Sequence, residues 1–156
     1  MSISFKHPIH NIADGVEDGK LLRTLATCHS LSRYEGALTG DPLDIKMFES
    51  TKWEFIDEPP VGGSNGRFEK MCPIVRKPKG FRTFIGSEHG EREEIAIVKQ
   101  FTFSSALLRM SVICRSSHDD CMEVYAKGAP EKIVELCKPQ TGWLITLFLT
   151  LINKLD

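Results

Sequence analysis

The sequence lacks the signatures that usually identify a catalytic centre. Its 156 residues contain no phosphate-binding G-x-x-x-x-G-K-[ST] loop, no dinucleotide-binding G-x-G-x-x-G turn, no H-E-x-x-H zinc motif and no G-x-S-x-G nucleophile elbow. The histidines are scattered, and His29, although it follows Cys28, has no second histidine or cysteine at ligand spacing. We therefore expect structural roles for these side chains, no metal site and no reaction centre within the chain.

An excess of charge of either sign is also missing. The 20 basic residues nearly balance the 21 acidic ones, which gives a formal net charge of −1. No global field therefore attracts nucleic acid or an anionic membrane, and we expect no nucleic-acid partner. The five cysteines are odd in number and include no C-x-x-C pair, which argues against a disulfide framework and favours reduced thiols in the cytosol.

Long hydrophobic runs are scarce. Residues 1–8 lack the basic start and apolar stretch of a signal peptide. The strongly apolar run at 143–152 is much shorter than the roughly 20 residues that span a bilayer. The chain length suits one compact domain, so we expect a domain over residues 1–142 and a divergent apolar tail over 143–156.

Two helices are predicted near the start of the chain. Asp18 can cap the first, whose apolar face would hold four residues at helical spacing. These four residues are Leu21, Leu22, Leu25 and Ala26.

The second helix has a sharper start signal. Gly-Asp-Pro-Leu-Asp at residues 40–44 sets a capping carboxylate before a proline at the first helical position, with another carboxylate three residues after the cap. A helix over about 42–49 follows from this pattern. Four of its residues are apolar enough to be largely buried: Leu43, Ile45, Met47 and Phe48.

The middle of the chain mixes weak strand and loop signals. Residues 52–56 alternate as a strand does, and the pattern then dissolves into a run rich in glycine and proline. We interpret the stretch from there to about residue 92 as a variable surface excursion, with short strands at 74–75 and 81–85.

Strand patterns become regular in the last third. Residues 94–101, 108–115 and 122–127 are β-rich, and the turn between the last two predicts an antiparallel hairpin. Pro130 then opens a short helix that ends before Pro139. Because no βαβ rhythm is present, the order of elements predicts an α+β fold with a mainly antiparallel sheet.

Lys127 and Gly128 stand where a strand ends and a helix begins. The glycine lets backbone or ligand approach closely, the lysine can face a phosphate or the edge of a base, and the helix N-terminus adds positive potential. Taken alone, the same pattern is common in ordinary turns, so a structural interpretation stays open beside the functional one.

Phe103 and Ser104 precede the strand that carries Arg109. An aromatic ring at the mouth of a strand can stack on adenine, while the hydroxyl and the arginine supply polar contacts. The alternative is that Phe101 and Phe103 both belong to the core. Asp44 is likewise a first-turn carboxylate that could also accept the adenine amino group.

In order and spacing, these segments resemble the nucleotide-binding (N) domain of P-type transport ATPases. The resemblance rests on Ala-Thr-Cys-His-Ser-Leu at 26–31, Gly-Asp-Pro-Leu-Asp at 40–44, the run 103–112 and Lys-Gly-Ala-Pro-Glu at 127–131. The residues at 100–107 and in the first two segments are similar to those of the P5B branch. Members of this branch are described as polyamine or cation transporters of endolysosomal membranes. The resemblance covers about residues 10–140.

The resemblance implies an antiparallel sheet flanked by helices and a site for ATP with Mg²⁺. Phe103 would stack on adenine, Lys127 would line the pocket near the base and the phosphates beside Gly128, and Asp44 would face the adenine amino group. These residues would be the main contacts of the nucleotide.

Arg109 and Ser104 are second-rank pocket residues by the same resemblance. Many relatives in other branches carry a lysine where this sequence has Leu108, and Arg109 would substitute for it at the phosphates.

The sequence also departs from the family. The phosphorylated aspartate of the family lies in an Asp-Lys-Thr-Gly-Thr segment on a separate domain, and this sequence has no such segment. The resemblance thus implies a module on the cytosolic side of an endolysosomal membrane that presents Mg-ATP to the phosphorylation domain of a parent with a transmembrane region. Residues 143–156 do not resemble the family, so we expect a domain incomplete at its C-terminus. The alternative is a truncated, non-catalytic chain that acts through protein–protein association.

Overall fold

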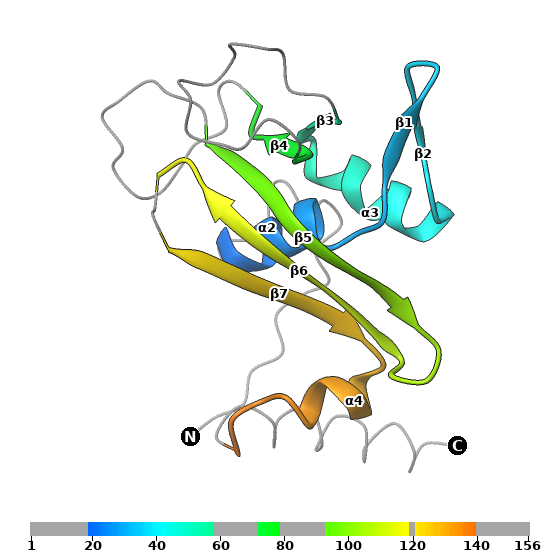
Figure 1. The fold of residues 1–156 in the computed structure, drawn as a ribbon, viewed down its shortest axis with the longest axis vertical. Coiled ribbons are helices and arrows are strands. Elements are labelled where there is room, and N and C mark those ends of the chain that lie inside the picture. Colours follow the sequence, from blue (N-terminus) through cyan, green and yellow to red (C-terminus); the bar gives the residue numbers. More distant parts are fainter. Residues whose placement is uncertain (1–18, 58–71, 79–92, 119–120, 140–156) are drawn as a thin grey trace, which may run out of the picture.

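The structure, a computed structural model, describes residues 19–57, 72–78, 93–118 and 121–139. Within them, five strands form one antiparallel sheet in the order β3-β4-β5-β6-β7, and two more form a separate hairpin, β1-β2. The helices are α2 (Gly19–Thr27), α3 (Pro42–Thr51) and α4 (Pro130–Val134). The strands are β1 (Ser32–Tyr34), β2 (Ala37–Thr39), β3 (Glu54–Ile56), β4 (Ile74–Arg76), β5 (Glu94–Ser104), β6 (Arg109–Ser116) and β7 (Met122–Gly128). The predicted α+β fold with an antiparallel sheet is confirmed (Figure 1).

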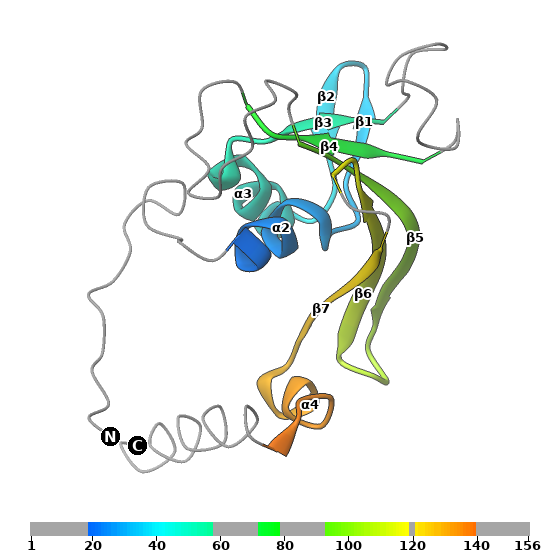
Figure 2. The ribbon, with the colours of Figure 1, turned by 90° about the vertical axis from the view of Figure 1, so that its left-hand side faces the viewer.

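Helices α2 and α3 pack together on one face of the sheet, which we call the helix face (Figure 2). Along β6 every second residue is buried, and Met110, Val112 and Cys114 point to this face. The alternating residues point to the opposite, outer face. The hydrophobic core fills the space between helices and sheet, and includes Ala26, Phe48, Trp53, Phe55 and Val75 besides the β6 residues.

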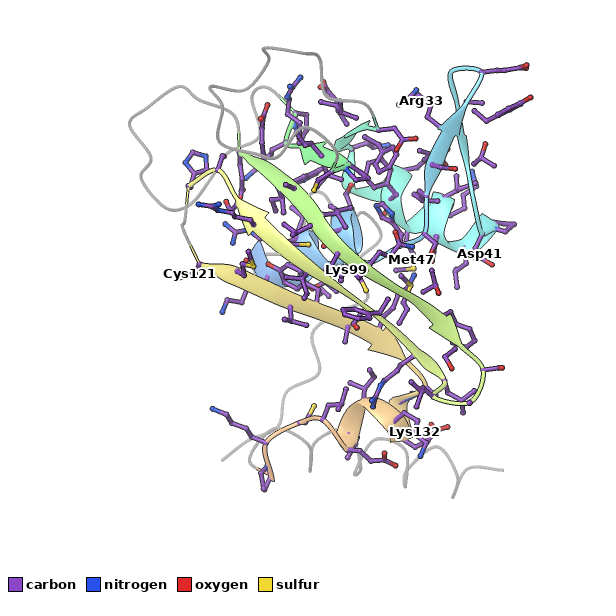
Figure 3. All side chains as sticks on the ribbon, viewed as in Figure 1. Arg33, Asp41, Met47, Lys99, Cys121 and Lys132 are labelled. Atoms are coloured by element: carbon purple, nitrogen blue, oxygen red, sulfur yellow. The ribbon has the colours of Figure 1, made fainter. Side chains whose placement is uncertain are left out.

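Helix α3 begins where its capping signal predicted. Asp41 lies at the start of the helix (Figure 3), and its carboxylate accepts hydrogen bonds from the backbone N–H groups of Leu43 at 2.8 Å and Asp44 at 3.3 Å. Pro42 holds the first helical position. The helix ends at Thr51, followed by Lys52 in the left-handed region at φ 63°. These termini leave a ten-residue helix, two residues longer than predicted.

The predicted burial of α3 was wrong at one position. Leu43 is 67% exposed, whereas Asp44 and Phe48, one helical turn apart, are 8% and 4% exposed. Ile45 and Met47 are half-buried. The stripe that faces the sheet therefore runs through Asp44 and Phe48, and Leu43 lies beside it.

Helix α2 follows its predicted pattern only in part. Leu22 and Ala26 are buried and Leu25 is half-buried, but Leu21 is 50% exposed. The buried stripe of the helix thus runs through Leu22, Ala26 and Thr27 and leaves Leu21 outside it. The predicted cap, Asp18, lies outside the described residues.

Strand β4 corrects the interpretation of the middle of the chain. It pairs antiparallel with β3 on one side and β5 on the other. Ile74 and Val75 are 2% and 0% exposed, so at least this part of the stretch belongs to the sheet and its core and is not a surface excursion. The strand predicted at 81–85 lies outside the described residues.

The β1-β2 hairpin was missed. Its two-residue turn places Glu35 at φ 49° and Gly36 at φ 81°, the positive dihedrals of a tight hairpin turn. The Arg33 guanidinium ties the hairpin to β3, because it donates to the carbonyl oxygens of Gly36 at 2.7 Å and Phe55 at 3.1 Å. An open hollow of about 420 Å³ lies beside this contact.

Helix α4 begins with Pro130 at its first position, as predicted, and follows directly on β7. It ends at Val134 and has no buried residue, so it is shorter than the pattern up to Pro139 suggested. It lies beyond the end of the sheet, away from α2 and α3 (Figures 1 and 3). None of the helices in the described part of the chain is long and apolar enough to cross a membrane. The predicted tail, 143–156, lies outside the described residues.

Candidate functional site

The structure brings Asp44 and Lys127 together although they are 83 residues apart in the sequence. Asp44 lies in the first turn of α3 and Lys127 near the end of β7. The Lys127 ammonium donates to Asp44 Oδ1, and Asp44 Oδ2 accepts from the backbone N–H of Ser30 at 3.4 Å. The two side chains are only 10% and 26% exposed, so water and salt screen their attraction less than that of a surface pair. Both carboxylate oxygens of Asp44 thus bind groups outside its own helix.

Sheet register places the ion pair on the helix face. Lys127 pairs with Met110 across β6 and β7, and Met110 is buried under the helices. Side chains of directly paired residues point to the same face. The Asp44–Lys127 pair therefore lies at the end of the helix face that is nearest to the β5-β6 turn.

Phe103 lies close to the same rung of the sheet. The β5-β6 register shifts between Phe101, which pairs with Ser111, and Ser104, which pairs with Arg109. Because of this bulge, Thr102 and Phe103 both lie opposite Met110, which places Phe103 on the face of Met110 and Lys127. Its ring is 59% exposed. The structure thus offers an uncovered aromatic surface near the ion pair.

The other three candidate residues form a row across the end of the sheet. Ser104 pairs with Arg109, and Arg109 pairs with Gly128. Because Arg109 precedes the buried Met110, alternation points its side chain to the outer face, opposite to Lys127. The structure thus separates the six candidates into Asp44, Lys127 and Phe103 on the helix face and this row at the sheet end.

Gly128 admits a close backbone approach. A Cβ atom at this position would lie 2.4 Å from the carbonyl oxygen of Leu108 and 2.7 Å from Cβ of Arg109. The same carbonyl accepts a hydrogen bond from Ala129 N–H at 2.9 Å. The glycine is therefore required by the β5-β6 turn, in which Leu108 itself has φ 50°.

Two buried side chains lie behind the pair. Burial raises the pKa of the Cys28 thiol to about 11, which keeps it protonated and unreactive. Burial also lowers the pKa of His29 to about 4. His29 Nε2 donates to the carbonyl oxygen of Ala26 at 2.9 Å, and Nδ1 accepts from Leu31 N–H at 3.3 Å. Both side chains have structural roles, as predicted.

Two polar residues near the site were not among the predicted ones. Gln100 Nε2 donates to the Ser30 hydroxyl at 2.7 Å, and Ser30 N–H reaches Asp44. No pattern in the sequence singles these residues out. Their only signal is that each lies inside a segment that carries the family resemblance.

A second polar network holds α2 to the sheet at the other end of β7. Arg23 pairs with Glu93 at 2.5 Å and with Glu123 at 3.1 Å, and the Tyr125 hydroxyl donates to Glu123 at 2.6 Å. Burial, followed by the bond to Glu123, raises the pKa of Tyr125. Within the described ranges, no group of three histidine, cysteine or acidic residues could hold a metal ion.

Comparisons with known proteins agree with the fold and with the family that the sequence resembles. A family model for the cytoplasmic domain N of P-type ATPases matches residues 68–143. The polyamine-transporting ATPase 13A3 of Macaca fascicularis is 43% identical over 148 residues, which cover 88% of this chain and 12% of the relative. Its human counterpart is 42% identical over the same shares. The probable cation-transporting ATPase catp-6 of Caenorhabditis elegans is 40% identical over 80% of this chain and 10% of its own length.

The chain thus spans about 12% of the length of the first of these relatives. The identities extend over most of the chain, and the matched domain is the one that the sequence resembled. The chain therefore belongs to the P-type ATPase family, as a cytoplasmic N domain similar to those of the polyamine- and cation-transporting ATPases.

Proposed function

We propose that this domain binds ATP together with Mg²⁺ at the end of its helix face, with adenine between the Phe103 ring and the Asp44–Lys127 pair. The observation that carries the proposal is this ion pair beside an aromatic ring that is 59% exposed. A carboxylate accepts the 6-amino group of adenine, an ammonium donates to ring nitrogens or phosphate oxygens, and a phenyl ring stacks on a purine. These three groups therefore complement the amino group, the ring nitrogens or phosphates, and the flat face of an adenine nucleotide.

We extend the proposal to the row at the sheet end as second-rank contacts. By the family resemblance, Arg109 would substitute for the lysine that many relatives in other branches carry at the position of Leu108, and it would meet the phosphates beyond the β5-β6 turn. Ser104 would add a hydroxyl there. Gly128 would contribute by letting the turn approach β7.

In a whole transporter, the domain would deliver Mg-ATP to an aspartate on the separate phosphorylation domain. Positioning is the main contribution of a protein to phosphoryl transfer, and this sequence lacks the Asp-Lys-Thr-Gly-Thr segment that would receive the phosphoryl group. The names of the relatives support polyamine or cation transport as the activity of the parent. The P5B resemblance supports an endolysosomal membrane, with this domain on the cytosolic side.

A titration of the purified chain with Mg-ATP, followed by backbone amide chemical shifts, tests the site. We expect shifts at Asp44, Phe103 and Lys127, and their loss in Phe103→Ala. Phe101→Ala is the matched control, because Phe101 is also half exposed, at 50%, but pairs with Ser111 and so points to the outer face. Equal loss of ATP binding in the two variants would contradict the assignment of Phe103.

The second candidate function is association between copies of the chain. It is favoured by β7, which lies at one edge of the sheet in the part of the chain that the structure describes, and whose Met122 and Val124 are 60% and 67% exposed. An apolar strand at a sheet edge can pair with a strand of another chain. A folded chain that shows no shifts with Mg-ATP, but whose sedimentation coefficient rises with protein concentration, would favour this alternative.

A further inference from the structure

The Asp44 carboxylate is held from both sides of the helix face. On the β7 side, the Lys127 ammonium donates to Oδ1. On the β5 side, the backbone N–H of Ser30 donates to Oδ2 at 3.4 Å, and the Ser30 hydroxyl accepts from Gln100 at 2.7 Å. Two segments outside α3 therefore donate directly to one carboxylate, and a third, β5, holds the residue that supplies one of these donors.

The two donors leave acceptor capacity on Asp44. An ionised carboxylate offers about four lone-pair positions, and the structure fills one on each oxygen. A further donor, such as an exocyclic amino group, can therefore bind without displacing Lys127. The direction of the remaining lone pairs is set by the donors already in place.

Gln100 lies on the same face and strand as the proposed stacking ring. It pairs with Val112, which is fully buried under the helices, and Met110, the next β6 residue on that face, pairs with Lys127. Phe103 follows Gln100 by three residues. The Gln100–Ser30 contact is thus one rung away from the ion pair.

We propose that Gln100 and Ser30 are positioning residues that aim Asp44 at the 6-amino group of adenine and so set a preference for adenine over 6-oxo purines. The inference rests on the ATP site proposed above. A 6-oxo purine presents a carbonyl oxygen where adenine presents the amino group, and that oxygen would face the carboxylate without a hydrogen. A carboxylate that is free to turn away discriminates less between the two bases.

The test compares Mg-ATP with Mg-ITP, whose base carries a carbonyl oxygen at position 6 in place of the amino group, together with a hydrogen on N1. Dissociation constants of both nucleotides are measured for the whole chain by calorimetry or amide shifts. In Gln100→Ala and Ser30→Ala we expect the ATP preference to fall by about threefold to tenfold, the range for loss of one neutral hydrogen bond. Ser30→Thr keeps the hydroxyl and should keep the preference.

Lys99→Ala is the matched control, because Lys99 is adjacent to Gln100 but pairs with Ile113 on the outer face. Melting temperatures identify variants that merely unfold. If the wild-type chain prefers ATP and Gln100→Ala keeps the same preference, this inference alone is overturned. An equal loss of affinity for ATP and ITP in Gln100→Ala overturns it as well. A wild-type chain that binds neither nucleotide overturns the proposed ATP site itself and the inference with it.

Discussion

At the residue scale, the surroundings of His29 keep its buried ring uncharged. His29 is 2% exposed and its ring meets those of Phe48 and Phe55 edge-on, at centroid distances of 5.3 and 5.6 Å. Its two ring nitrogens are satisfied by one backbone carbonyl and one backbone N–H, a pattern that requires the neutral ring with its proton on Nε2. A second proton on the ring would break the bond to Leu31.

Stability should therefore fall as the pH is lowered from about 6.5 to about 4. The pKa of His29 is 6.5 when the side chain is solvated and about 4 in the fold, so the unfolded chain binds more protons in this window. The free energy of unfolding should lose up to about 3 kcal/mol from this group. Urea denaturation across the pH window measures the loss.

Two variants isolate the histidine from the carboxylates that also titrate at low pH. His29→Gln should be less stable at pH 7 but show a flatter dependence, whereas replacement of the exposed His118 by Gln should leave the wild-type slope. An unchanged slope in His29→Gln would contradict the role given to burial.

The start of α3 could be predicted from the sequence better than the burial of its individual residues. The cap at Asp41 follows from local chemistry, because its partners are the next residues along the chain. Leu43 was expected to be largely buried, but the structure exposes it and buries Asp44. The rotation of the helix against the sheet, together with Lys127 from another element, decides which side is buried.

Among the elements, the junction of the β5-β6 turn with β7 leaves little room for a larger side chain. Gly128 lies against the backbone of Leu108 and Arg109, and the turn is closed by Leu108 N–H, which donates to the Ser104 carbonyl oxygen at 2.7 Å. A backbone atom cannot move aside as the end of a long side chain does. The junction therefore fixes how β7, with Lys127 on it, meets β6.

Gly128→Ala should destabilise the domain by about 1–3 kcal/mol, since the added methyl group overpacks against backbone. The same substitution at Gly19, where nothing lies within 4 Å of the added atom, should be neutral or stabilise α2 by up to about 1 kcal/mol. Thermal unfolding of both variants measures the difference. Equal stabilities would show that the turn relaxes away from β7 without cost.

The strands that could be predicted correctly are those with a strong local sequence pattern. The long strands β5, β6 and β7 lie within a few residues of their predicted ranges, because β-branched runs and a turn mark them. The β1-β2 hairpin has three-residue strands with mostly exposed side chains, so no alternation reveals it. The burial of β4 depends on its pairing with a strand on each side, which its own sequence does not encode.

At the scale of the whole molecule, the site is assembled from contacts distant in sequence. Asp44 and Lys127 meet only because α3 lies on the sheet near the end of β7. No spacing rule in the sequence predicts contact between residues this far apart along the chain. What the sequence supplied was the order of several motifs, each weak alone, that together resemble one domain. The division of the chain at residue 142 stays a prediction.

The chain should bind Mg-ATP without turning it over. In the proposed function, the phosphoryl group passes to an aspartate on a separate domain, in a segment that this sequence lacks. Phosphate release from Mg-ATP should therefore stay at the level of buffer in a colorimetric assay, with or without added spermine, while titration shows binding. Phe103→Ala, which should not bind, is the control. Phosphate release by the wild-type chain that disappears in this variant would reveal a reaction centre within the domain and would contradict its role as a module that only presents the nucleotide.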